Sequence, residues 1–341
     1  MNLIIDIGHP AQLNFLKIAI ERLALKHTVF VSYLNRGKLP VIMRRELSKF
    51  TLVQVGEHRG SLYSILVHAN FLRLLEFMRF IIMNRIDLGI NGGVPLGLAL
   101  KFLGRKHIQF DDDIERKLTI FLEIITSDKL IVFPDYQVTH ISRKWKNLQF
   151  VHSLKEWAYL SPAYYKPDSS IPQAYGLTPG SYIFLREVSN KTVNYMGHES
   201  GLICKYQQTI DSLQLKVILS LEDKSTQEQY PENWTILQEP VDDIHSLMYF
   251  SRYVISSGDS MAREGAMLGV VSIYCGFRDM IANRYIQEFG LLFWVKSEPD
   301  MDVVFSNKLI HDQEAYRRGL LESWIDVNDL IVSTINNYDR R

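Results

Sequence analysis

The chain has 341 residues, of which 47% are hydrophobic and 22% charged, a balance that excludes a wholly disordered protein. Its length suits two domains of roughly 150 to 180 residues each. The sequence has two cysteines, Cys204 and Cys275, which excludes a disulfide framework and a cysteine-based zinc cluster. With no signal-peptide pattern at the start and no apolar run long enough for a spanning helix, we expect a cytoplasmic protein.

The two halves of the sequence carry opposite net charges. Residues 1–160 hold 22 Lys and Arg against 14 Asp and Glu, a balance of +8, and residues 161–341 hold 16 against 24, a balance of −8. The basic half suits an anionic acceptor or an anionic membrane surface, although a solvated face that helps the domains dock explains it equally well. If the acceptor is lipid-linked, Leu62–Arg85 is the expected peripheral membrane contact. Nucleic acid is not an expected partner because no dense basic stripe with interleaved aromatic residues is present.

In chain order, the first half alternates short apolar runs with helical patterns. The helical spacing of Leu13, Leu16, Ile20 and Leu23 follows the first run. Buried strands separated by helices predict a parallel sheet that is covered on both faces. The expected strands are Leu3–Ile7, Thr28–Tyr33, Leu52–Val55, Leu88–Ile90, Ile108–Phe110 and Leu130–Phe133.

A proline-rich stretch then interrupts the pattern before it resumes. Four of the 11 prolines fall between Pro162 and Pro179, and we expect no helix there. The second half repeats the rhythm, with expected helices at Asp242–Phe250 and Ser260–Leu268, a last helical stripe from Val327 to Tyr338, and expected strands at Tyr182–Leu185, Leu215–Leu219, Trp234–Leu237, Tyr253–Ser256 and Val270–Tyr274.

These patterns predict an α/β protein with two tandem Rossmann-like domains. The expected division is an acceptor domain at 1–160, a linker at 161–180 and a nucleotide-sugar-binding domain at 181–341, whose last helix is able to pack back on the first domain. Ligands of such folds lie beyond the carboxyl ends of the strands, so the expected site is the cleft between the domains.

The segment from Tyr253 to Gly269 is the most informative motif. An apolar strand leads through Ser256, Ser257 and Gly258 into a helix that ends at a glycine. Small residues let a diphosphate approach the backbone, and the first turn of a helix offers unpaired N–H groups and a positive dipole end. Ser260 is placed to cap the helix or to bond a phosphate oxygen, and a plain strand–turn–helix with an N-cap serine explains the pattern as well.

This segment, Gly258-Asp259-Ser260-Met261-Ala262-Arg263-Glu264 with Gly265–Gly269, resembles the Gly-Gly-Thr-Met-x-x-Glu-Ala-x-x-Leu-Gly signature of a domain-of-unknown-function family of bacterial and archaeal proteins. That family is grouped with GT-B glycosyltransferases of the MurG type and with UDP-N-acetylglucosamine 2-epimerases. The similarity extends to Asp6–Pro10, Phe110–Asp112, Lys155–Leu160 and Leu185–Glu187.

The resemblance implies a GT-B fold, with a nucleotide-sugar donor bound mainly by the second domain. By position it implies that Ser257, Gly258 and Ser260 approach the diphosphate and that Glu264 reaches the ribose. Arg186, at a strand end, is placed to clamp a phosphate, or alternatively pairs with Glu187 on the surface. The expected nucleotide-sugar-binding residues are Arg186, Ser257, Gly258, Ser260, Met261, Glu264 and Arg278.

Two residues depart from the patterns of the related enzymes. Asp259 stands at the signature's second glycine, and its carboxylate repels a diphosphate unless Arg263 or Arg186 pairs with it. Leu185 replaces a histidine of the 2-epimerases. No metal and no cofactor are expected, because arginines, helix dipoles and N–H groups carry the charge of the leaving diphosphate in GT-B enzymes.

The loops after the strands of the first domain supply the expected acceptor side. His9 is the first choice for a catalytic base, with a capping or buried histidine as the alternative. Asp112, within Asp111–Asp113, is the second expected catalytic residue; three carboxylates there could supply a base or bind Mg²⁺, or form the acidic first turn of a helix near Ile114. The expected acceptor-side residues are Gly8, Gln12, Asn91, Gly92 and Gly93.

The expected function is a glycosyltransferase that moves a sugar from a UDP-sugar or similar donor to a hydroxyl of a glycan or lipid-linked acceptor in cell-surface polysaccharide biosynthesis. Two alternatives stay open: a UDP-N-acetylglucosamine 2-epimerase or nucleotide-sugar hydrolase, and a non-catalytic sugar-nucleotide-binding protein.

Overall fold

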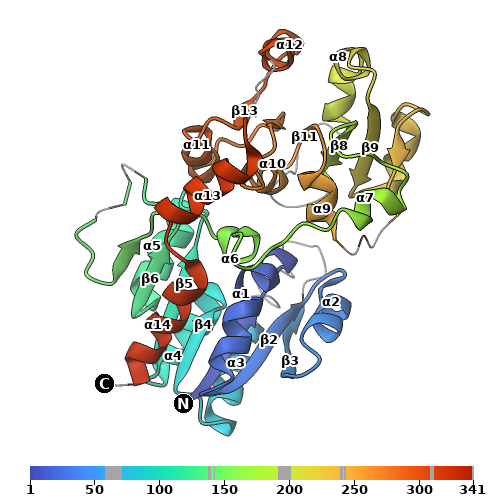
Figure 1. Cartoon of the computed structure of the whole chain (residues 1–341). Helices are drawn as coiled ribbons and strands as arrows, with labels where there is room; N and C mark the ends of the chain where they lie inside the picture. Colours follow the sequence, from blue (N-terminus) through green and yellow to red (C-terminus); the bar gives the residue numbers. More distant parts are fainter. Residues whose placement is uncertain are drawn as a thin grey trace. The chain divides into compact units, whose positions relative to one another are not determined.

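The chain folds into two compact units, which we describe one at a time (Figure 1). Unit 1 comprises Met1–Tyr159 and Trp324–Arg341, and unit 2 comprises Leu160–Ser323. Each unit contains one parallel sheet with helices, which confirms the predicted α/β class with two Rossmann-like domains. The computed structural model describes residues 1–57, 71–136, 140–141, 143–190, 201–238, 241, 243–307 and 311–339.

Within the described residues, the sheet of unit 1 has seven strands, and all of its pairings are parallel. The chain starts in the middle of this sheet and moves outward in both directions. In spatial order the strands are β3 (Thr51–Glu57), β2 (Thr28–Asn35), β1 (Asn2–Ile7), β4 (Leu88–Asn91), β5 (Lys106–Asp111), β6 (Lys129–Val132) and β7 (Leu148–Phe150).

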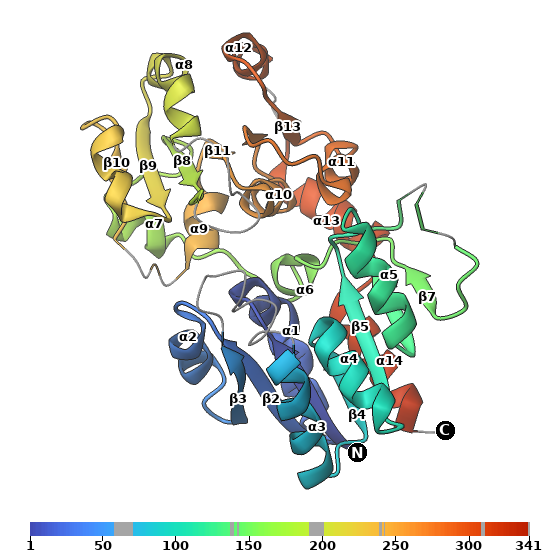
Figure 2. The same ribbon diagram turned by 180° about the vertical axis from the view of Figure 1, so that it is seen from behind.

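Helices cover both faces of this sheet, as the continuous apolar strands require. On one face α1 packs against α14 and α2, and on the other α4 packs between α3 and α5, which lie in front of the strands in Figure 2. The helices of unit 1 are α1 (Pro10–Leu23), α2 (Leu39–Glu46), α3 (Arg73–Met83), α4 (Gly93–Phe102), α5 (Lys117–Thr126), α6 (Trp157–Leu160, at its border) and α14 (Val327–Asp339).

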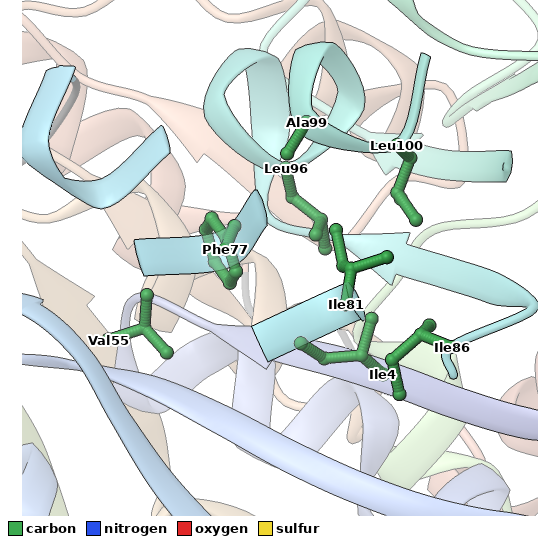
Figure 3. Close-up of a cluster of buried hydrophobic side chains, with 8 residues drawn as sticks. All are labelled: Ile4, Val55, Phe77, Ile81, Ile86, Leu96, Ala99 and Leu100. Atoms are coloured by element: carbon green, nitrogen blue, oxygen red, sulfur yellow. The ribbon is translucent and has the colours of Figure 1, made fainter. Parts of the chain in front are cut away.

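A cluster of eight buried apolar side chains joins α3 and α4 to the sheet (Figure 3). Burying one such side chain stabilises a fold by about 1.5–3 kcal/mol. Gly89 of β4 makes the close approach of α4 possible, because a Cβ there would lie 2.2 Å from Cδ1 of Leu100. The cluster consists of Ile4, Val55, Phe77, Ile81, Ile86, Leu96, Ala99 and Leu100.

Unit 2 repeats the architecture with a parallel sheet of six strands in the described part of the chain. Their spatial order is β10 (Thr235–Ile236), β9 (Lys216–Leu221), β8 (Tyr182–Glu187), β11 (Tyr253–Ser256), β12 (Ser272–Tyr274) and β13 (Leu292–Trp294). The helices are α7 (Ser170–Ala174), α8 (Gln207–Ser212), α9 (Ile244–Tyr249), α10 (Asp259–Met267), α11 (Ile281–Gln287), α12 (Glu298–Ser306) and α13 (Gln313–Ser323), with 3₁₀ turns η3 (Leu202–Tyr206) and η4 (Lys224–Gln229).

The structure differs from the sequence prediction in a few elements. The expectation of no helix in the proline-rich stretch is wrong, because α7 lies there; Pro172 falls in the first turn of α7, where the missing N–H has no helical partner to lose. The helix expected near Ile114 begins at Lys117. The beginning of Leu62–Arg85, up to residue 70, and Asp242 lie outside the described residues.

Candidate functional site

The strand order reverses between β1 and β4 in unit 1 and between β8 and β11 in unit 2. Ligands of doubly wound folds bind beyond the carboxyl ends of the strands at such reversal points. The motifs of the sequence lie at these two edges: Gly8 and His9 follow β1, Gly92 follows β4, and the Ser257-Gly258 turn joins β11 to α10.

Serine hydroxyls fix the turn between β11 and α10. Oγ of Ser257 accepts a hydrogen bond of 3.0 Å from the backbone N–H of Val188, and Oγ of Ser256 bonds both the N–H and the C=O of Gly258. The buried Ser257 side chain thus joins the ends of β8 and β11. The hydroxyl of Ser257 also hydrogen-bonds the carboxylate of Glu187, so any contact of this buried residue with a diphosphate has to come from the shape of the turn.

The N-cap of α10 is Gly258, which has an extended backbone, and Ser260 is the second residue of the helix. Ser260 and Met261 are the half-exposed residues of this first turn, whereas Ser256 to Asp259 are buried. The N–H groups of the first turn of a helix have no partner within the helix, and they lie at its positive end. The turn therefore presents a small surface that favours an anion.

Asp259 points into a pair of guanidinium groups. Its Oδ2 lies 3.4 Å from Nη1 of Arg263 and 3.4 Å from Nη1 of Arg278. Asp259 is 3% exposed and Arg263 1%, and Nη1 of Arg263 also donates to Oδ1 of Asn283 at 2.9 Å. Two guanidinium groups face one carboxylate and compensate its charge, so Asp259 does not by itself make this edge repulsive to a diphosphate.

Arg186 extends sideways from the end of β8 toward β9. Its Nη1 donates to Oγ of Ser220 at 2.8 Å, and its Nη2 lies 3.6 Å from Oε2 of Glu222. The alternative pairing with Glu187 is not the one that forms: Glu187 points to the other face, where it accepts the N–H of Ile203 at 3.0 Å. Burial raises the pKa of Glu187, although the hydrogen bonds to its carboxylate act against this shift.

Glu264 is paired with His245, a residue that belongs to no motif of the sequence. Nε2 of His245, on α9, donates to Oε2 of Glu264 at 3.1 Å, and both side chains are largely buried. Burial opposes the charged imidazole, but the hydrogen bond to Glu264 and the charges of Glu264 and Asp243 outweigh it, so the pKa of His245 is raised. The only sequence signal was the acidic residue two positions before His245.

His9 is the N-cap of α1. Its Nδ1 accepts the N–H of Ala11 at 3.2 Å, and Oε1 of Gln12 accepts the N–H of Gly8 at 2.8 Å. Desolvation by the surrounding protein and the positive charges of Arg36 and Lys155 lower the pKa of His9 to about 4, and the desolvation is the weaker argument because the residue is exposed. Because Nδ1 accepts a bond, the neutral ring carries its proton on Nε2, where it donates.

The loop after β4 is held in an unusual backbone conformation. Asn91, Gly92 and Gly93 have successive φ values of 58°, 78° and 56°. A Cβ on Gly92 would lie 2.7 Å from Cβ of Leu96. Asn91 is buried; its Oδ1 accepts the N–H of Phe110 at 3.1 Å, and its carbonyl accepts from Nε2 of His107 at 2.7 Å. The loop is thus a fixed turn at the carboxyl edge.

Carboxylates follow β5 on the same edge. Oδ2 of Asp112 lies 2.6 Å from Nζ of Lys155, so its charge is paired. Glu123 of α5 is a further buried acid, 3.6 Å from the position of a Cβ on Gly93. Burial, followed by the charge of Asp111 and a hydrogen bond with it, raises the pKa of Glu123 well above its usual range. Among the described residues, no group of three or more His, Cys, Asp or Glu side chains is arranged to hold a metal ion.

A pocket of about 240 Å³ lies on unit 2, lined by residues that include Gly180, Arg252, Tyr253, Val270 and Val271. These residues stand at or just before the amino ends of β8, β11 and β12. The pocket is therefore at the opposite end of the strands from the β11–α10 turn, and it is not the expected nucleotide site.

Comparisons with known proteins agree with this architecture. The structure matches the UDP-GlcNAc 2-epimerase from Methanocaldococcus jannaschii in complex with UDP-GlcNAc and UDP with a TM-score of 0.73 at 12% identity, covering 99% of this chain and 100% of the other. It matches the UDP-GlcNAc 2-epimerase from Neisseria meningitidis bound to UDP-GlcNAc with a TM-score of 0.72 at 11% identity, covering 99% of this chain and 100% of the other. MurG from Acinetobacter baumannii matches with a TM-score of 0.59 at 14% identity, covering 98% of this chain and 99% of the other. These similarities show a shared fold.

Sequence comparison gives one curated relative and a family. The uncharacterized protein MJ0665 from Methanocaldococcus jannaschii is 25% identical over 179 residues, which are 51% of this chain and 50% of that protein, so the match spans half the length of the relative. In the described part of the chain, no helix is both long and apolar enough to cross a membrane. The resemblance inferred from the sequence is confirmed, because residues 145–340 match a family of this kind and the structural relatives are 2-epimerases and MurG. With more than half of its length matched, the chain belongs to the family described as "Protein of unknown function (DUF354)".

Proposed function

We propose that the chain is a metal-independent glycosyltransferase of the GT-B type that binds a UDP-sugar or similar donor at the β11–α10 edge of unit 2. The observation that carries the proposal is the pairing of Asp259 with Arg263 and Arg278, which compensates the charge of this carboxylate beside the positive end of α10. Electrostatic stabilisation by fixed cations and N–H groups is a main means of stabilising a leaving diphosphate without a metal. The structural relatives determined with UDP or UDP-GlcNAc support a nucleotide-sugar ligand.

In this proposal, each residue of the donor edge has a distinct task. Ser260, Met261 and Gly258 form the surface against which the diphosphate lies, and Arg278, with a side chain 21% exposed, contacts it while Arg263 stays buried. Glu264 accepts hydrogen bonds from the ribose hydroxyls. Arg186 can contact the diphosphate only if it releases Glu222, so we assign it a smaller contribution to donor binding.

The carboxyl edge of unit 1 is proposed to hold the hydroxyl acceptor, a glycan or lipid-linked sugar. A base must take the proton of the attacking hydroxyl. His9 is suited to donate from Nε2, because its Nδ1 serves the helix cap and its pKa is lowered to about 4. We therefore assign Asp112 as the base and His9 as the group that orients the acceptor, together with Gly8, Gln12, Asn91, Gly92 and Gly93.

Incubation with a panel of nucleotide sugars, each with and without hydroxyl acceptors, tests the reaction. The expected result is release of the nucleoside diphosphate only when an acceptor is present. Asp112→Asn should lower kcat about 10²–10⁴-fold with little change in donor affinity. Asp128→Asn should leave kcat unchanged, because Asp128 precedes β6 and lies at the amino ends of the strands, on the opposite edge of the sheet. Tight nucleotide-sugar binding without turnover across the panel would instead support a non-catalytic binding protein.

A second candidate, a nucleotide-sugar 2-epimerase or hydrolase, is favoured by one observation. Asp111 and the buried Glu123 form a carboxyl pair that keeps a proton on Glu123, and such pairs supply an acid and a base. Incubation with UDP-N-acetylglucosamine alone separates the candidates. An epimer or a free sugar that forms without an acceptor, and is lost in Glu123→Gln, would favour this second candidate.

Peripheral contact with an anionic membrane is the part of the proposal that concerns a lipid-linked acceptor. On α3, Leu75, Ile82 and Met83 are exposed large hydrophobic residues, and Arg79 and Arg85 are exposed near them. Apolar residues next to basic ones suit the surface of an anionic bilayer. Flotation with liposomes that contain anionic lipid, at low and at high salt, tests this contact; no binding at low salt would contradict it.

A further inference from the structure

We propose that His245 is a positioning residue that holds Glu264 for recognition of the ribose hydroxyls, so that the site distinguishes a ribonucleotide from a 2′-deoxyribonucleotide. The inference rests on the proposed function, because it concerns the same nucleotide. It adds a residue from α9 that neither the signature of α10 nor the strand ends pointed to.

His245 on α9 and Glu264 on α10 form a hydrogen-bonded pair. Glu264 is on α10, one turn after the phosphate-facing residues, and α9 packs against α10. His245 donates from Nε2 to Oε2 of Glu264 at 3.1 Å, with the two side chains 16% and 10% exposed. A carboxylate has about four lone-pair sites, so a bond to the imidazole fixes its orientation and still leaves it able to accept hydroxyl hydrogens.

Tyr165 and Asp243 surround the other side of His245. Asp243, the N-cap of α9, is fixed by the hydroxyl of Tyr165 at 2.9 Å and by the N–H of Ser246 at 3.1 Å. The ring of Tyr165 meets the ring of His245 edge to face at 5.8 Å between centroids. In the described part of the chain, the charged and titratable groups around the imidazole include Glu264 from α10, Asp243 from its own helix and Tyr165, and α7, which also packs on α9, contains no charged residue.

Two carboxylates face one imidazole, and this arrangement favours the imidazolium, in agreement with the raised pKa of His245. The charged pair gives Glu264 a fixed, ionised carboxylate, and hydrogen bonds to an ionised acceptor are about twice as strong as neutral ones. As the pH rises through the pKa of His245, the imidazole loses its charge and the restraint on Glu264 weakens. Discrimination between ribose and deoxyribose should then decline.

Titration calorimetry with UDP, 2′-deoxy-UDP and inorganic pyrophosphate, between about pH 5.5 and pH 8.5, tests the inference. The wild-type protein should prefer UDP to 2′-deoxy-UDP by about tenfold at the acidic end, which corresponds to a charge-assisted hydrogen bond, and the preference should fall toward the alkaline end. In His245→Ala the preference should drop to within about twofold, with pyrophosphate affinity unchanged.

His245→Gln keeps a donor without the charge, so it should retain part of the preference and lose the pH dependence. His311→Ala is the matched control: His311 is exposed and donates to the carbonyl of Gly269, away from the β11–α10 turn. Unchanged pyrophosphate binding shows that each variant is folded. UDP binding with the same preference in His245→Ala as in the wild type would overturn this inference alone, whereas absence of UDP binding to the wild type would overturn the proposed function as well.

Discussion

Oδ2 of Asp259 lies 3.4 Å from Nη1 of Arg263, one helical turn further along α10. The residue that breaks the glycine-rich signature is thus neutralised within its own helix, and Arg278 approaches the same oxygen from the loop after β12. The carboxylate organises two guanidinium groups at an edge where fold and motif place an anionic ligand.

Asp259→Asn should destabilise the protein by about 3 kcal/mol, because removing one partner of a buried ion pair leaves an uncompensated charge. Arg263 is 1% exposed, and its Nη1 also donates to Oδ1 of Asn283 at 2.9 Å and contacts the sulfur of Met280. Urea unfolding measures the effect. Asp279→Asn is the control, because the pair of Asp279 with Arg284 is exposed and should contribute less than about 1 kcal/mol. Equal losses in both variants would contradict the role given to the buried pair.

Gly89→Ala should destabilise unit 1 by about 1–3 kcal/mol, since the added methyl group would overlap Leu100 and push α4 from the sheet. Gly319→Ala is the matched substitution: Gly319 lies within α13 with no atom within 4 Å of the added Cβ. It should stabilise the helix by as much as about 1 kcal/mol. Thermal unfolding should show a lower melting temperature for Gly89→Ala and an equal or higher one for Gly319→Ala. An unchanged melting temperature in Gly89→Ala would contradict the close packing of α4 on β4.

Acid should destabilise the protein through His107. Burial lowers the pKa of this histidine to about 4, while the ring stays neutral, donates to Asn91 and accepts from the hydroxyl of Ser127. An unfolded histidine binds its proton near pH 6.5, so between about pH 6.5 and pH 4 the unfolded state holds more protons than the folded state. The free energy of unfolding therefore decreases as the pH is lowered through this range, by up to about 1.4 kcal/mol per pH unit. Urea unfolding at several pH values should show a shallower fall in His107→Gln; an identical slope would contradict the assignment.

Glu123→Gln should stabilise the protein at neutral pH and above. Burial and the neighbouring Asp111 raise the pKa of Glu123, so the folded state retains a proton that the unfolded state releases above about pH 4.5, and stability declines as pH rises. Glutamine has no proton to lose. The melting temperature of the variant should exceed that of the wild type by a margin that grows from about pH 5 to pH 8; a constant or reversed margin would mean that Glu123 is ionised in the fold.

The sequence was sufficient to predict the strands of the fold where a continuous apolar run was long. Runs such as Leu3–Ile7 and Tyr253–Ser256 are continuous and apolar because helices cover both faces of a parallel sheet, and each is a strand. The edge strands β7 and β13, of three residues each, were missed, whereas the equally short β12 lies at the end of the longer run Val270–Tyr274 and was expected. Pro172 was read as a helix breaker, although the first turn of a helix tolerates proline.

For the candidate site, the sequence indicated where loops gather but not how side chains pair. Strand ends meet at one edge in any parallel sheet, so His9, Gly92 and Asp112 could be grouped from their positions. The partner of Asp259 depends on which way a buried side chain turns, and the position of the proton on His9 depends on a single cap hydrogen bond. His245 carries no motif, since its importance comes from the packing of α9 on α10.

Titration calorimetry of a UDP-sugar into the wild type, Arg278→Ala and Arg284→Ala tests the donor site most directly. Arg278 reaches Asp259 at the start of α10, whereas Arg284 pairs with Asp279 on the surface of the same unit. The account predicts binding to the wild type, a loss of about tenfold or more in Arg278→Ala, the size expected for a charged contact with phosphate, and no loss in Arg284→Ala. Equal affinity in all three proteins, or no binding to the wild type, would contradict it.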